Sequence, residues 1–154
     1  MTSLMNVNEK LCLDDGSGDT DAGKYRRLVG ILLYLTHTRP NLMYVVSVVP
    51  RYMHRPSMHH LGAVKRIMHH IASTLDFGLL YQSSDQLRLR GYTDSDCGGS
   101  VDDRKSTTGW VFNIGSAVVA WSSKEQDITA LSSVEAEYIS HFSCLPRHMA
   151  EKTP

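Results

Sequence analysis

Apolar side chains in the first half of the chain recur every three or four residues, which is the spacing of one helix face. Two such stretches cover residues 25–38 and 40–53, and Pro40 separates them because proline keeps the residue before it out of the helical region. A third stretch follows Ser57, whose hydroxyl can accept from the free amides of a helix start. The pattern predicts three consecutive helices.

The second half of the chain changes to the pattern of strands. Residues 87–93, 107–114 and 117–121 are rich in β-branched and aromatic side chains, and short turns connect the last two stretches. Ser132 is followed three residues later by Glu135, the spacing of a capping box that opens a final helix. The chain is therefore predicted to be α+β, with N-terminal helices before a three-stranded antiparallel meander and one helix.

Polar stretches between these elements divide the chain. Leu79-Leu80-Tyr81 can form a short strand, and the polar turn at 82–86 is the predicted domain boundary. Density in glycine and aspartate near residues 14–21 favours a solvated linker over a calcium loop, because the closing glutamate is missing. The predicted segments are a disordered polar N-terminus (1–24), a helical segment (25–81), a strand-and-helix unit (87–144) and an irregular tail (145–154).

Composition excludes several classes of protein. Lys+Arg and Asp+Glu are both 16, so the chain lacks the basic excess of a dedicated nucleic-acid binder, and a nucleic-acid partner is not expected. Three widely spaced cysteines suggest no disulfide framework. The longest apolar run is too short to span a bilayer, and no signal peptide is visible at the N-terminus.

Two stretches carry the residues best suited to chemistry. Residues 91–96 end a strand in carboxylates, and residues 131–138 place two more on a helix start. A carboxylate at a strand end facing one on a nearby helix is suited to holding a divalent cation. Histidines also gather on the third helix, but no pair has the spacing of three or four that one ion needs, so packed or solvated histidines are the interpretation. These histidines are His59, His60, His69 and His70.

Several motifs in fixed order resemble the end of the Pol polyprotein of copia-type retrotransposons. The resemblance runs from about residue 25 to about residue 142 and implies the end of a reverse transcriptase followed by a truncated ribonuclease H domain. The motifs lie at residues 25–30, 33–36, 38–40, 60–67, 91–96, 102–109 and 130–138.

The resemblance implies roles for particular carboxylates. The first metal-binding aspartate of ribonuclease H folds corresponds to Asp94 and the glutamate of the first helix to Glu137, whereas Glu135 is the capping partner and Asp96 a neighbour of the site. The family's third and fourth carboxylates lie on later elements that have no counterpart here, and Cys97 stands where the family usually has tryptophan. We therefore expect no enzyme activity and no cofactor, with weak Mg²⁺ or Mn²⁺ binding at the relic pair.

As a separate chain, the sequence also resembles the secreted RxLR effectors of oomycete plant pathogens. The corresponding motif is degenerate, because Arg26, Arg27 and Leu28 are followed by Val29 in place of arginine, and the same residues belong to the copia pattern. This resemblance implies secretion, action in the host nucleus or cytoplasm on defence or cell death, and an unknown host protein as partner. The alternatives are a metal-dependent nuclease acting on RNA–DNA hybrids and the product of a pseudogene.

Overall fold

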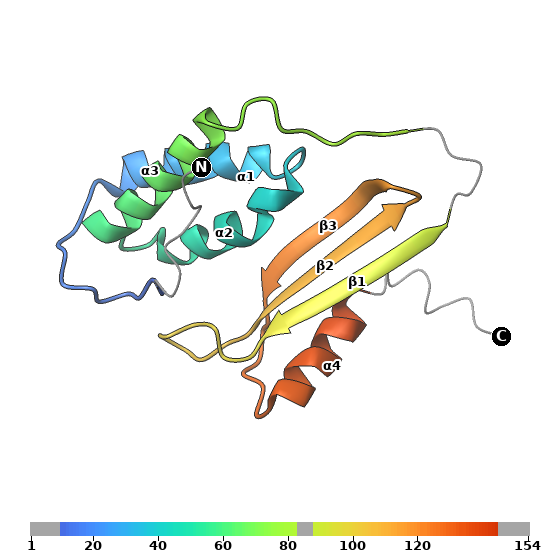
Figure 1. The fold of residues 1–154 in the computed structure, drawn as a ribbon. Helices are drawn as coiled ribbons and strands as arrows, with labels where there is room; N and C mark the ends of the chain where they lie inside the picture. The colour runs from blue at the N-terminus through green and yellow to red at the C-terminus, as the bar shows by residue number, and fades with distance from the viewer. Residues whose placement is uncertain (1–9, 83–87, 145–154) are drawn as a thin grey trace. The chain divides into compact units, whose positions relative to one another are not determined.

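Helices come first along the chain, strands follow, and a last helix comes after the strands, as Figure 1 shows. The structure, a computed structural model, describes residues 10–82 and 88–144. The chain divides into a helical unit that reaches Leu79 and also includes Ser100–Asp102, and a sheet unit formed by Leu80–Gly99 and the residues from Asp103 onward. The elements are α1 (Ala22–Leu35), α2 (Met43–Val48), α3 (Met58–Ala72), β1 (Leu89–Asp96), β2 (Thr107–Ile114), β3 (Ala117–Glu125) and α4 (Ser133–Cys144). The predicted α+β class is confirmed.

The core of the helical unit is made of the apolar faces of α1, α2 and α3. Tyr25 is fully buried on α1, and its hydroxyl donates to the carbonyl of Val49 at 2.8 Å. Burial raises the pKa of this tyrosine. The single helix predicted over 40–53 is instead α2 between two 3₁₀ turns, Pro40–Leu42 and Val49–Tyr52. Both turns begin at or next to a proline, which lacks the amide that a continuous helix would use.

Residues 10–21 form a loop with defined contacts, where the sequence predicted disorder. The loop supplies hydrogen-bond partners to the first turn of α3: Met58 N donates to Gly18 O at 2.9 Å, and His59 N donates to Ser17 Oγ at 3.0 Å. These amides would otherwise lack partners, because the first turn of a helix has no internal acceptors. The polar residues of this loop thus cap the N-terminus of α3. Residues 1–9, 83–87 and 145–154, which include the predicted boundary turn and tail, lie outside the described part of the chain.

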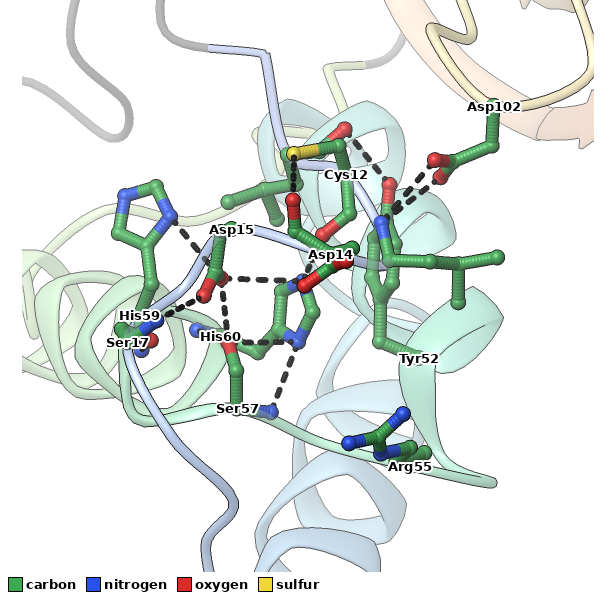
Figure 2. A network of polar contacts seen from close by, with 12 residues as sticks. Cys12, Asp14, Asp15, Ser17, Tyr52, Arg55, Ser57, His59, His60 and Asp102 are labelled. Carbon is green, nitrogen blue, oxygen red and sulfur yellow. Dashed lines mark hydrogen bonds and ion pairs between the residues drawn. The ribbon is translucent and has the colours of Figure 1, made fainter.

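A buried polar network joins this loop to α3 (Figure 2). Ser57 caps α3, because its hydroxyl accepts from His60 N at 3.2 Å and donates to the carboxylate of Asp15. The imidazole of His60 accepts at Nδ1 from Ser57 N at 3.0 Å and donates from Nε2 to the carbonyl of Cys12 at 3.0 Å. Its ring stacks on Tyr52 with centroids 4.0 Å apart. This arrangement requires a neutral imidazole with its proton on Nε2.

The three strands form an antiparallel sheet in the order β1-β2-β3, which confirms the predicted meander. β1 continues to Asp96 and β3 to Glu125, beyond their predicted ends, because the backbone of each still pairs with the first residues of β2. The strand predicted at 79–81 is wrong. Leu80 and Tyr81 are exposed there, and nothing in the described chain pairs with their backbone as a ladder.

Helix α4 packs on β1 and β2 through small side chains. Ala136 and Ser140 are fully buried, and their size lets the helix approach the sheet closely. Gln126 follows β3 and lies under the helix, with Nε2 within 3.0 Å of Ala136 O and Thr108 Oγ1 and 3.2 Å from Ser95 Oγ. One buried amide therefore links two strands and the helix.

The His60 network predicts that the helical unit loses stability as the pH falls. Burial lowers the pKa of His60, although the Cys12 carbonyl and Asp15 favour the charged form. In the unfolded chain His60 binds a proton as the pH falls below its ordinary pKa of 6.5, whereas in the folded chain it stays neutral to a lower pH. The free energy of unfolding therefore decreases below about pH 6.5. Urea unfolding followed by helical circular dichroism, at about pH 7.5 and about pH 5.5, measures the loss.

A pair of histidine variants isolates the effect. His60→Leu should be less stable at neutral pH and lose much of the pH dependence, whereas His69→Gln, at an exposed position on the same helix, should retain it. Fluorescence of Trp110 and Trp121 follows the sheet unit separately. An unchanged pH dependence in His60→Leu would contradict this account.

Candidate metal site

Asp94 lies near the end of β1 with its side chain exposed, opposite Gly109 of β2. Its backbone is held from α4, because the Ser140 hydroxyl donates to the Asp94 carbonyl at 3.0 Å. The same hydroxyl also contacts Thr93 Oγ1. The packing of α4 on the sheet therefore fixes the backbone of Asp94, which carries the carboxylate.

Glu137 lies on the flank of α4 nearer to β1. Ala136 and Ser140 face the sheet, and Ile139 and Ser143 line a cavity of about 550 Å³ over β2 and β3. Successive side chains turn by about 100° around a helix, so Glu137 is on the side opposite this cavity. Its side chain is exposed. The two carboxylates nevertheless lie on different faces of the sheet. Thr93 contacts Ser140 of α4, so the side chain of the next residue, Asp94, points to the face away from the helix.

The pair does not amount to a two-metal centre. Within residues 10–82 and 88–144, no three His, Cys, Asp or Glu side chains are arranged to hold a metal ion. Two-metal hydrolysis needs carboxylates that bridge and flank ions about 4 Å apart. Exposed carboxylates on different faces of the sheet suit at most hydrated Mg²⁺ or Mn²⁺ ions, most of whose ligands would be water. The residues present do not fit the catalytic group that the resemblance implies.

Asp96 has a structural task. Its carboxylate accepts from the backbone amide of Thr107 and so closes the loop between β1 and β2. A Cβ added to Gly99 would overlap this carboxylate at 2.1 Å, which shows how closely the loop folds over it. The contact suits the predicted role of Asp96 as a neighbour of the site.

The degenerate RxLR-like residues form part of the second turn of α1. Val29 is fully buried and Leu28 packs against the same core, whereas Arg26 and Arg27 are exposed. Arg26 Nε donates to the Met53 carbonyl at 3.2 Å. Two of the four motif residues, Leu28 and Val29, therefore pack in the hydrophobic core of the helical unit.

The Ser57, His60 and Asp15 contacts form a constellation that the sequence interpretation did not identify. Its residue types are those of a hydrolase triad, but the Ser57 hydroxyl donates to Asp15, and His60 is fully buried with Nε2 bound to a carbonyl. A nucleophile needs an accessible hydroxyl whose proton passes to the histidine. The network is a helix cap. Ser57 was its only sequence signal, because Asp15 lies 42 residues away along the chain.

Comparison with known proteins identifies relatives of this chain. The chain is 40% identical over 138 residues to the retrovirus-related Pol polyprotein from transposon RE1 of Arabidopsis thaliana, and 37% identical to that from transposon TNT 1-94 of Nicotiana tabacum. The chain belongs to the copia-type retrotransposon Pol family. It is also 38% identical over 116 residues to secreted RxLR effector protein 161 of Plasmopara viticola.

The extent of these matches differs. The matched residues make up 90% of this chain but only 9% of the RE1 polyprotein and 10% of the TNT 1-94 polyprotein, so the chain spans about a tenth of these Pol relatives. The effector match covers 75% of this chain and 82% of the effector. No family model and no solved structure gives a match. None of the helices described is long and apolar enough to cross a membrane.

The site predicts weak binding of divalent cations. Titration with Mn²⁺ by calorimetry should give a dissociation constant no tighter than about 1 mM, because two exposed carboxylates leave most of the coordination to water. Asp94→Asn with Glu137→Gln should remove the signal. Micromolar binding that disappears in this double variant would contradict the account and show that a fuller ligand set exists.

Proposed function

We propose that this Pol-derived chain is a non-catalytic protein that acts, like secreted RxLR effectors, inside host plant cells by binding a host protein. The observation that carries the proposal is the extent of one match. The chain covers 82% of secreted RxLR effector protein 161 at 38% identity, so a protein of nearly this extent bears an effector's name. The Pol relatives support descent, and their whole activities do not transfer to about a tenth of their length.

Surface chemistry supports a binding role. Helix α4 carries exposed apolar residues at helical spacing on the face that points away from the sheet. Rings of two of them touch, with centroids 4.8 Å apart. Contiguous exposed apolar side chains of this kind mark sites of protein contact. The stripe consists of Val134 (77% exposed), Tyr138 (65%) and Phe142 (58%), and Leu131 (94%) lies just before the helix.

A second candidate is a ribonuclease H-type nuclease, favoured by the similarity to Pol polyproteins over the segment that holds Asp94 and Glu137. The incomplete ligand set and the balanced charge of the chain count against it. A non-functional pseudogene product is the remaining alternative. Both alternatives differ from the effector proposal in their expected effect on cell death in a host plant cell. For an effector, the proposed location is the host nucleus or cytoplasm after secretion.

Expression in plant leaf challenged with a cell-death elicitor tests the proposal. The intact chain and Glu137→Gln, which removes one relic carboxylate and leaves the sheet unchanged, should suppress cell death equally. Tyr138→Ser with Phe142→Ser should act more weakly because it removes the exposed ring pair. Circular dichroism of the purified variants controls for folding.

The alternatives give different results in the same assay. Loss of suppression in Glu137→Gln alone would point to metal chemistry and favour the nuclease. Absence of any effect from the intact chain, at confirmed protein levels, would contradict the effector proposal and leave the transposon remnant.

A further inference from the structure

β1 is an edge strand: in the part of the chain that the structure describes, its only paired neighbour is β2. Arg88 O accepts from Gly115 N at 3.1 Å, so the backbone groups of even-numbered positions point to β2. Backbone groups alternate in direction along an antiparallel strand. The N–H and C=O groups of Leu89, Gly91, Thr93 and Ser95 therefore face the open side, where they can pair with another strand.

β1 carries opposite charges at equal distances on either side of Tyr92. Arg90 lies two residues before Tyr92 and Asp94 two residues after it, and all three side chains are exposed. We propose that two copies of this chain pair antiparallel through β1, with Tyr92 on the two-fold axis. Arg90 of each copy then lies opposite Asp94 of the second copy, on the same face of a continuous six-stranded sheet.

The hydrogen-bond pattern agrees with this register. Odd positions face odd positions across the new edge, so Gly91 and Thr93 of the two copies exchange backbone hydrogen bonds. Arg90 and Asp94 then form non-hydrogen-bonded pairs, whose Cα atoms approach to about 4.5 Å and whose side chains are closest. Opposite charges at such positions stabilise a sheet, whereas like charges destabilise it.

Other registers fit less well. A shift by one residue would place outward backbone groups opposite groups that point to β2, which breaks the ladder. A shift by two would set Tyr92 against Asp94 or Arg90 and leave one kind of reciprocal pair, whereas the proposed register forms two, Arg90 with Asp94 and Arg88 with Asp96. The chain carries no net charge, so long-range repulsion does not oppose association. Charge complementarity therefore selects a second copy as the occupant of this edge.

Charge reversal and exchange test the proposal on the full chain. Sedimentation velocity over a concentration series should show a monomer–dimer equilibrium. Arg90→Asp and Asp94→Arg should each weaken dimerisation by at least about tenfold, because each puts like charges opposite one another twice. The double variant Arg90→Asp/Asp94→Arg restores opposite charges and should recover the affinity.

Lys124→Glu reverses a charge on β3, at the other edge of the sheet, and serves as the matched control with unchanged dimerisation. Tryptophan fluorescence and circular dichroism confirm that each variant folds. A chain that stays monomeric at every concentration would overturn the proposal. So would a dimer that is insensitive to the single reversals, or a double variant as weak as the single ones.

Discussion

The sheet unit depends on β1, a strand whose only hydrogen-bonded neighbour among the described residues is β2. β1 receives its ladder from β2 and its cover from α4, and the Ser140 hydroxyl fixes the carbonyl of Asp94 between them. The candidate metal ligand Asp94, the Arg90 and Asp94 charges of opposite sign and the outward-facing backbone groups all lie along this strand. Natural sheets usually protect such edges with charge, a bulge or a covering segment. Here the charges are arranged so that a second copy of the strand can meet them.

In the helical unit, polar side chains and loop carbonyls provide acceptors for the free amides at the start of α3. The polar N-terminal loop of this unit supplies acceptors to the first turn of α3, and His60 lies neutral at the centre of that cap. Buried polar groups stabilise a fold only when their hydrogen bonds are made, and here the serine, histidine and aspartate satisfy one another. A set of residues that resembles catalytic machinery is therefore explained by helix capping. Both units use polar side chains to complete backbone hydrogen bonding.

Local signals in the sequence predicted most elements, and long-range contacts account for what they missed. The strand Thr107–Ile114 and the Ser57 cap were predicted because β-branched and aromatic enrichment and capping chemistry act over a few residues. The ordered loop at 10–21 was missed because its partners lie about forty residues away. For the site, position within the copia motifs singled out Asp94 and Glu137, while spacing alone placed carboxylates only on a strand end and a helix. The sequence shows that Arg90 and Asp94 lie two residues on either side of Tyr92. Their use in pairing two copies could be inferred only once the structure showed which backbone groups of β1 face the open edge.

Amide hydrogen exchange along β1 tests the central claim most directly, because it reports each backbone group separately. At high protein concentration, the amides of Gly91, Thr93 and Ser95 should be protected in the intact chain and exchange freely in Arg90→Asp. The amides of Tyr92 and Asp94, which point to β2, should be protected in both proteins. If the three outward amides exchange equally fast in the two proteins, β1 has no partner in solution and the account of the edge is wrong.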